Sequence, residues 1–272
     1  MQSCTRRVVT HSLAKLALVV GMLLPAIGFG APQRFAPPAP KDLVGQELRF
    51  VSCPIVRATE HPCWVTEYEG ELYFLGVQAG GVSDFIAPQL NHRVLVEGVV
   101  TDKPRVCGGI VLDPVRTSTM RDVDRSCNAI LPAEGHVIVT HERGPGPAPT
   151  QPRRREVREV EHVPELRTFR VEFDFDMERA WVKNIMKINE AAVFAAAIGA
   201  KRVEVVGYRG RVRLSNGAVL EELPFMPKRR AEYVESVLRA VGTGGAEIAV
   251  RFEDEPSGDD PSARSALITV IP

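Results

Sequence analysis

The sequence lacks an excess of either charge. Its 34 Lys and Arg residues equal its 34 Asp and Glu residues, so the net charge at pH 7 is zero. A chain without net charge has no global electrostatic field to draw it onto nucleic acid or an anionic membrane, and we predict no nucleic-acid partner. The 44% hydrophobic content over 272 residues is typical of a globular chain with one large domain or two smaller ones.

The sequence also lacks the patterns of common catalytic and metal sites. Its six histidines show no H-x-x-H or H-E-x-x-H spacing, and its cysteines include no C-x₂-C pair. The segment "GTGG" lacks the Lys-Ser/Thr of a phosphate-binding loop and follows a predicted helix. The acidic "EDEPSGDDP" does not have EF-hand spacing, which favours a solvated loop over a calcium site. We therefore predict a non-catalytic protein without cofactor or metal.

The amino terminus is typical of an exported protein. Basic residues precede the apolar run "LALVVGMLLPAIGFG", and the small residues Gly28 and Gly30 suit cleavage after Gly30. We predict a signal peptide over residues 1–30 and a Pro-rich leader over residues 31–41. A retained membrane anchor is the alternative, although the run is shorter than the roughly 20 residues that cross a bilayer.

Cleavage at that point removes Cys4 and leaves four cysteines, an even number that indicates disulfides in an exported protein. Four cysteines allow three pairings, and the sequence does not choose among them. We predict sequential pairing because it closes the shortest loops. The predicted pairs are Cys53 with Cys63 and Cys107 with Cys127. A zinc site is the alternative, which an oxidising compartment disfavours.

Residues 42–141 alternate short apolar runs with turn residues, and no long helical periodicity interrupts them. Five strands are predicted, at "ELRFVSC", "CWVTEYEG", "ELYFLGVQ", "RVLVEGVV" and "GIVLDPV". The segment "SDFIAPQL", before the fourth strand, could hold a short helix. This order resembles an OB-fold, an all-β five-stranded barrel, and implies either a binding face for oligonucleotides or oligosaccharides or a protein-binding module. Four aromatics could form a stacking face or pack in the core: Trp64, Tyr68, Tyr73 and Phe74.

Residues 142–165 are predicted to be a linker. Their segment "GPGPAPTQP" cannot build a core, and "RRREVREVEHV" is charged throughout. Such a linker predicts that the two flanking domains tumble independently. The run Arg153, Arg154 and Arg155 could contact anionic lipid or cell-wall polymer, but a solvated charge run is the simpler interpretation.

Residues 166–272 mix strand and helix patterns. "FRVEFDFD" alternates apolar and charged residues like a half-buried strand, and "WVKNIMKINEAAVFAAAIGA" has an apolar helical stripe that ends at Gly199. A second strand, "RVEVVGY", precedes a second helix, "RRAEYVESVLRAVG", which ends at Gly242. "AEIAVRFED" and "SALITVIP" are the last two strands. The predicted fold class is therefore two domains, an all-β barrel followed by an α/β (α+β) βαβαββ domain.

The order of "FDFD", "VVGY", "RRAEYV" and a terminal R-x-x-x-I-x-V resembles the OmpA-like peptidoglycan-binding family over residues 166–272. In that family an acid after the second strand and an arginine that opens the second helix hold the diaminopimelate of the stem peptide. One anion and one bidentate cation suit a ligand end that carries both ammonium and carboxylate. Arg230 falls on the arginine position, and its neighbour Arg229 could fill the same role. Arg264 matches one of two arginines before the last strand, where bracing the sheet is the simpler role.

The acid of the family motif is absent. Tyr208, Arg209 and Gly210 stand where the family has Tyr or Phe, Thr and Asp, and a cation at Arg209 would repel the ligand's ammonium. The following segment, "GRVRLSNGAVLEE", predicts a hairpin that turns at Asn216 and Gly217.

The hairpin would return Glu221 and Glu222 to the strand end. Either carboxylate could replace the missing acid and rebuild the site, or both could be solvated or paired with Lys228 and Arg229.

The leading hypothesis is an exported envelope protein that binds peptidoglycan through residues 166–272. The predicted location is the periplasm, in association with the cell wall or the outer membrane, with no membrane span after signal cleavage. The alternative is a scaffold whose ligand site is lost and whose hairpin recruits another envelope protein. A carboxylate that faces Arg230 across a small open pocket would favour the first hypothesis.

Overall fold

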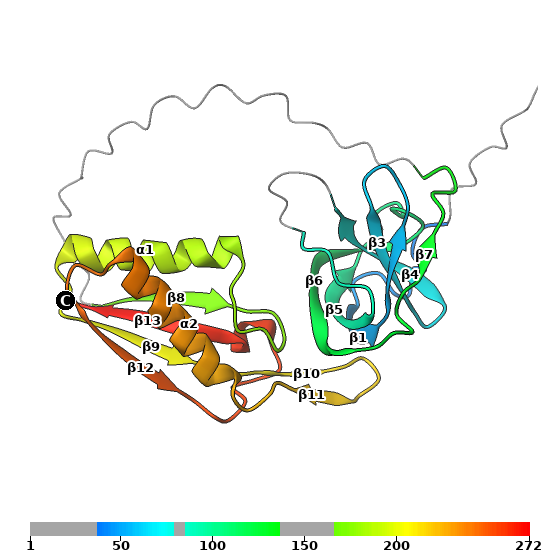
Figure 1. The fold of residues 1–272 in the computed structure, drawn as a ribbon. Helices are drawn as coiled ribbons and strands as arrows, with labels where there is room; N and C mark the ends of the chain where they lie inside the picture. The colour runs from blue at the N-terminus through cyan, green and yellow to red at the C-terminus, as the bar shows by residue number, and fades with distance from the viewer. Residues whose placement is uncertain (1–36, 79–84, 137–165) are drawn as a thin grey trace, which may run out of the picture. The chain divides into compact units, whose positions relative to one another are not determined.

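The computed structural model describes residues 37–78, 85–136 and 166–272, and these described residues form one compact unit. The predicted signal peptide, most of the leader and the predicted linker lie outside the described residues. We refer to residues 37–136 as the amino half and to residues 166–272 as the carboxyl half. The architecture is mostly β (Figure 1). None of the helices in the described ranges is both long enough and apolar enough to cross a membrane.

The amino half forms a seven-stranded sheet with the order β1-β5-β6-β4-β3-β2-β7. The five predicted strands correspond to β1, β3, β4, β5 and β6, whereas β2 and β7 were not predicted, and residues 85–90 contain no helix. The predicted closed barrel is not confirmed, because the hydrogen-bonded order is open, although only Cys53 separates β1 from β2. The strands are β1 (Glu47–Ser52), β2 (Pro54–Arg57), β3 (Cys63–Tyr68), β4 (Glu71–Val77), β5 (His92–Val100), β6 (Ile110–Val123) and β7 (Ile130–Leu131).

The aromatics of the amino half are largely core residues. Trp64 and Tyr73 are buried in one hydrophobic cluster with Phe50, whose ring stacks on Tyr68 at a centroid distance of 4.3 Å. Phe74 packs against a second cluster around Cys63. Alternate positions of a strand face opposite sides, so these side chains fill the two sides of the sheet. The packing interpretation is therefore the better supported one for the four aromatics.

The disulfides are nested, so the predicted sequential pairing is wrong. Cys53 is bonded to Cys127 and Cys63 to Cys107, with Cα–Cα distances of 4.8 and 6.6 Å. In the β2–β3 pair Arg57 faces Cys63 and Pro54 faces Thr66. Cys53 therefore lies about four residues, roughly 13 Å, along the sheet from Cys63, beyond the approximately 7 Å limit for a disulfide. Cys107 and Cys127 lie beyond opposite ends of the 14-residue strand β6, so they are also too far apart to form a disulfide.

The carboxyl half has a four-stranded sheet with the order β12-β9-β13-β8, in which β12 and β9 are parallel and β13 is antiparallel to both of its neighbours. The predicted order of strands and helices is found, and the predicted hairpin is β10 paired with β11. The elements are β8 (Arg167–Glu172), α1 (Val182–Ile198), β9 (Arg202–Gly207), β10 (Arg211–Arg213), β11 (Val219–Glu221), α2 (Met226–Val241), β12 (Glu247–Phe252), a 3-10 turn (Pro261–Ala263) and β13 (Ser265–Ile271).

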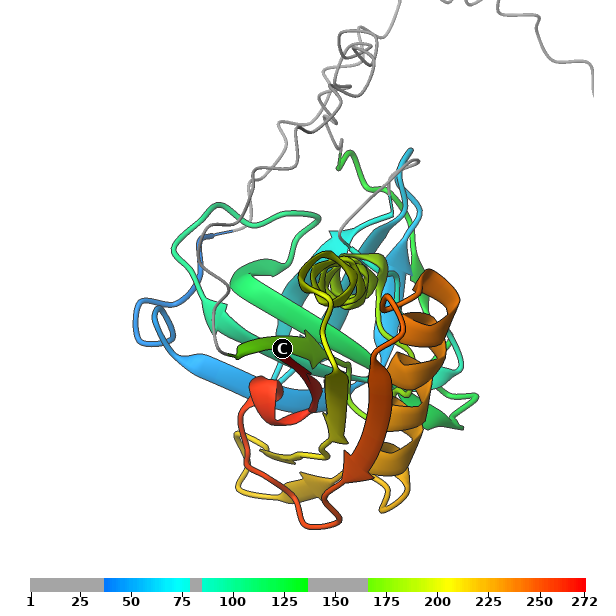
Figure 2. The same ribbon diagram turned by 90° about the vertical axis from the view of Figure 1, so that its left-hand side faces the viewer.

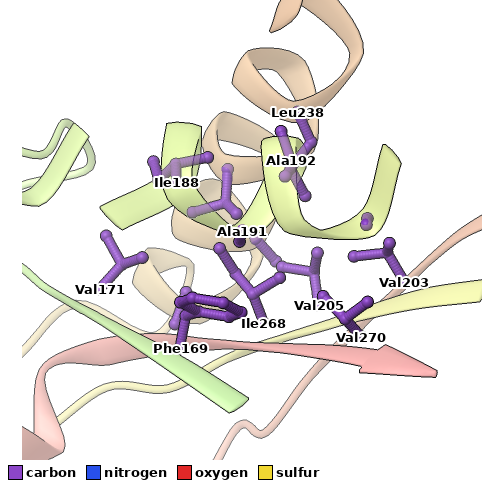
Figure 3. Packing of buried hydrophobic residues seen from close by; sticks show 14 of the residues in the cluster. Phe169, Val171, Ile188, Ala191, Ala192, Val203, Val205, Leu238, Ile268 and Val270 are labelled. Atoms are coloured by element: carbon purple, nitrogen blue, oxygen red, sulfur yellow. The ribbon is translucent and has the colours of Figure 1, made fainter. Parts of the chain in front are cut away.

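Both helices pack on the same face of this sheet. Figure 3 shows Ile188 and Ala192 of α1 and Leu238 of α2 above Val205 of β9 and Ile268 of β13, all fully buried. The apolar spacing of α1 produces this stripe, and Gly199 ends the helix in the left-handed conformation at φ 63°.

Gly207 brings the start of α2 close to the end of β9. A Cβ atom at this position would lie 2.0 Å from the carbonyl oxygen of Pro227, so only glycine allows the approach. The close contact fixes where the first turn of α2 stands relative to residues 208–210.

The two halves are in contact within the compact unit. Phe175 donates its backbone N–H to Ser118 Oγ at 3.0 Å, and Ser215 donates its backbone N–H to the Arg49 carbonyl at 2.7 Å. One buried cluster combines Leu95 of β5 with Phe175, Val212 and Leu214 of the carboxyl half. Independent tumbling of two domains is therefore not confirmed.

Candidate functional site

Arg230 and Glu222 form the centre of the candidate site. Arg230 lies in the first turns of α2, and Glu222 directly follows the hairpin strand β11. Arg230 Nη1 donates to Glu222 Oε2 at 2.8 Å, and Nη2 donates to the other carboxylate oxygen. Both side chains have an exposed fraction of 0%. The hairpin thus brings a carboxylate to Arg230, but without the small open pocket between them that would favour a rebuilt site.

The remaining N–H groups of Arg230 are also bonded. Nε donates to the Met177 carbonyl at 3.0 Å, Nη1 to the Tyr208 carbonyl at 2.9 Å and Nη2 to the Asp174 carbonyl at 3.1 Å. A guanidinium has five N–H groups. The three bonds to carbonyls and the two bonds to Glu222 together use all five. Arg230 therefore has no donor left for a ligand in this conformation.

Glu222 is equally occupied. Its carboxylate accepts the backbone N–H groups of Gly210 at 2.7 Å and Asp176 at 2.8 Å, in addition to the two bonds from Arg230. Gly210 is the position at which the sequence resemblance predicts an acid, and Glu222 places a negative charge beside it. The charge is neutralised in place, and no open pocket separates it from Arg230.

The other hairpin residues predicted for the site lie elsewhere. Glu221 is exposed and 3.6 Å from Arg209, so the structure distinguishes it from Glu222. Asn216 accepts the backbone N–H of Ala218 at 3.0 Å and shapes the hairpin turn. Neither residue contacts Arg230 or Glu222 through these interactions: Glu221 lies on the surface and Asn216 lies in the hairpin turn.

The two cations predicted beside the site differ in exposure. Arg209 is largely buried and donates to the carbonyls of Asp254 at 2.5 Å and Glu222 at 2.9 Å. Arg229 lies on the exposed side of α2, where its Nη1 is 3.8 Å from Glu232 Oε2. Tyr208 contributes its carbonyl to Arg230. Arg229 is therefore exposed at the start of α2, whereas Arg209 is largely buried.

Arg264 forms a second buried pair, with Glu97 of β5. Arg264 Nη2 donates to Glu97 Oε2 at 2.5 Å, and the side chains are 0% and 4% exposed. Arg264 Nε and Nη1 and the second oxygen of Glu97 are buried without a hydrogen-bond partner in the described structure. The bracing role is therefore better supported for Arg264 than ligand contact.

Sequence reasoning missed Glu97, Asp174 and Asp176. The strand pattern of "RVLVEGVV" gives Glu97 no separate role, although a lone acid inside an apolar run indicates a buried charge that needs a partner. Asp174 and Asp176 follow β8 and line a pocket of about 280 Å³ with Trp181. Burial raises the pKa of both carboxyl groups, and Trp181 Nε1 donates to Asp174.

No group of three or more His, Cys, Asp or Glu side chains capable of holding a metal ion occurs in the described ranges. The arrangement of the site offers charge pairing and packing.

Comparison with known proteins yields no family model and no curated protein that matches the chain. Among solved structures, the chain is similar to the OmpA-like domain of FopA1 from Francisella tularensis subsp. tularensis SCHU S4, with 15% identity and a TM-score of 0.31 over 39% of this chain and 73% of that one. It is also similar to a putative MotB-like protein from Desulfovibrio vulgaris, with 11% identity and a TM-score of 0.29 over 39% and 76%. These scores are too low to transfer a function.

Proposed function

We propose that this chain is a non-catalytic interaction protein of the cell envelope and that its carboxyl half does not hold a stem peptide through Arg230. The observation that carries the proposal is the closed Arg230–Glu222 pair, in which all five guanidinium N–H groups have internal acceptors. A ligand carboxylate would have to displace Glu222 and leave it buried without its cation. Breaking a buried pair in this way typically costs about 3–5 kcal/mol.

The envelope location rests on the amino-terminal sequence and the disulfides. Residues 1–30 have the basic, apolar and small-residue order of a signal peptide. Two disulfides link the cysteines of the amino half, which suits an oxidising compartment. Together these features support export.

The β10–β11 hairpin is the surface that we assign to a protein partner. Arg211 and Arg213 project from it with substantial exposure, and both approach Asp259. Val219, on the opposite strand of the hairpin, is an exposed apolar residue. Arginines around an exposed apolar side chain are typical of the composition of protein interfaces.

Peptidoglycan binding remains the second candidate, and one observation favours it. Glu222 reaches the arginine position that the family resemblance identified, so the charges of a rebuilt site are together. Binding would then require an opened conformation in which Arg230 exchanges Glu222 for the ligand carboxylate.

Sedimentation with insoluble peptidoglycan separates the two candidates. We expect the purified full chain to stay in the supernatant, alongside an authentic OmpA-like domain that sediments. The proposal is wrong if the chain sediments, is released by free diaminopimelate and loses binding in Arg230→Lys with an unchanged circular dichroism spectrum. Arg229→Lys is the matched control, because this neighbour is exposed and outside the buried pair.

Site-specific photo-crosslinking in cells tests the partner surface. A photoreactive residue at Val219 is expected to crosslink to another envelope protein, and Arg213→Glu is expected to weaken that crosslink. The control position is Val193 of α1, an exposed valine outside the hairpin. Equal crosslinking at both positions, or none at Val219, would contradict the assignment of the hairpin.

A further inference from the structure

Strand β12 is an edge of the carboxyl-half sheet. It pairs with β9 on one side, and no described strand pairs with its other side (Figures 1 and 2). Glu247 donates its backbone N–H to the Lys201 carbonyl at 2.9 Å, and Glu253 donates to the Gly207 carbonyl at 3.0 Å. Main-chain groups alternate sides along a strand, so Ile248, Val250 and Phe252 direct their N–H and C=O groups to the open side.

The side chains of β12 also alternate. Ile248 and Val250 are half-buried on the face that the helices cover, whereas Glu247 and Arg251 are exposed on the opposite face with Ala249 between them. An exposed edge with unpaired main-chain groups and apolar side chains is a template for another strand. Among the described residues, β12 forms one ion pair, between Arg251 and Glu204 at 3.2 Å.

We propose that β12 pairs antiparallel with β12 of a second copy of this chain. The open-side groups of Ile248 then bond to those of Val250 in the other copy, and the reciprocal pair forms by symmetry. Ala249 faces its own equivalent at a non-hydrogen-bonded position, where the Cα atoms approach to about 4.5 Å and a small side chain fits. Glu247 faces Arg251 of the second copy, and this opposite-charge pair also forms twice.

Charge selects this register over its neighbours. A shift by two residues in one direction places Glu247 opposite Glu253 of the second copy, and a further such shift places Arg251 opposite itself. A shift in the other direction places Glu247 opposite Ala249. A shift by one residue would turn the hydrogen-bonding groups away from each other. The proposed register therefore combines matched main-chain groups with two opposite-charge pairs, and the two sheets join into one.

Charge reversal tests this interface on the purified full chain by sedimentation velocity over a concentration series. We expect the wild-type chain to dimerise, and Arg251→Glu and Glu247→Arg each to weaken the dimer at least about tenfold in Kd, because each places like charges opposite one another. The control is Arg93→Glu. The side chain of Arg93 is 60% exposed, close to the 63% of Arg251, and it also forms an ion pair with one acid.

Mixing the two single variants provides the decisive arm. The Arg251→Glu chain has acids at both positions 247 and 251, and the Glu247→Arg chain has arginines at both. Because position 247 of one chain faces position 251 of the other, an equimolar mixture is expected to form a heterodimer at least as tight as the wild-type dimer. This result also shows that both variants are folded. A wild-type chain that remains monomeric at all concentrations, a dimer unchanged by Arg251→Glu, or a mixture that stays monomeric would each overturn the proposal.

Discussion

The two buried arginine pairs of this protein differ in how completely they are satisfied. Arg230 bonds to Glu222 and to three carbonyls, and every N–H group has an acceptor. Arg264 bonds to Glu97 through one nitrogen, while its other two side-chain nitrogens have no partner in the described structure. A buried ion pair stabilises a fold only when additional hydrogen bonds offset its desolvation. The two arginines are equally buried, but the Arg230 pair is expected to stabilise the fold much more than the Arg264 pair.

The largest effect is expected from Glu222→Ala. This change leaves Arg230 buried with an uncompensated charge and removes the acceptor of two backbone N–H groups, so the free energy of unfolding should fall by about 3–5 kcal/mol. Urea denaturation of the full chain measures the change. Glu221→Ala is the control, because the exposed neighbour should alter stability by less than about 0.5 kcal/mol. Equal effects of the two variants would show that the Arg230 pair is not integral to the fold.

Replacing each whole pair by apolar residues sharpens the comparison. Glu97→Leu with Arg264→Met should be neutral or stabilising by about 1–4 kcal/mol, because few hydrogen bonds are lost. Glu222→Leu with Arg230→Met should destabilise the fold, because three carbonyls and two N–H groups lose their partners. Melting curves of the two double variants provide the test, and a change of the same sign in both would refute the distinction.

A smaller effect is expected from Asp174→Asn. Burial raises the pKa of Asp174 above its ordinary value of 3.8, so the folded state binds its proton more tightly than the unfolded state does. Stability is then lost as the pH rises from 3.8 through the folded pKa. The amide avoids this loss and can still accept from Trp181, so the variant should be more stable at pH 7 by less than about 1 kcal/mol.

The pH dependence provides the readout for Asp174. The change in denaturation midpoint from pH 4 to pH 7 should be more favourable in Asp174→Asn than in the wild-type chain, because the variant lacks the loss of stability that Asp174 causes over this range. The reverse, a steeper loss of stability toward pH 7 in the variant, would contradict the raised pKa. Asp260→Asn serves as a comparison, because hydrogen bonds from Ser262 lower the pKa of that carboxyl group.

Local patterns were sufficient for much of the carboxyl half. The stripe that ends at Gly199, the turn at Asn216 and Gly217, and the alternation in "RVEVVGY" predicted α1, the β10–β11 hairpin and β9. These features depend on residues within a few positions of one another, where side-chain period and turn chemistry act directly. The start of α2 was predicted three residues late, because Met226 and Pro227 belong to a first turn that the charged "KRR" obscured.

The amino half was predicted less completely. Its strands were recognised, but β7 has only two residues, and β2 is separated from β1 by Cys53 alone, so neither carries a periodic pattern of its own. The disulfide pairs depended on which strands are neighbours. The β2–β3 register and the length of β6 exclude the sequential pairing that loop length favoured.

The sequence by itself determined the charge balance, the amino-terminal pattern on which the prediction of export rests, the pattern of strands and helices, and the presence of an arginine and nearby acids in the carboxyl half. Only the tertiary structure decided that Glu222 rather than Glu221 meets Arg230, that Glu97 meets Arg264 from 167 positions away, and that β12 has an open side. The physical reason is that periodicity reports which side of an element is buried. The identity of a buried partner depends on how distant elements pack, and desolvation makes that partner decisive for every charge.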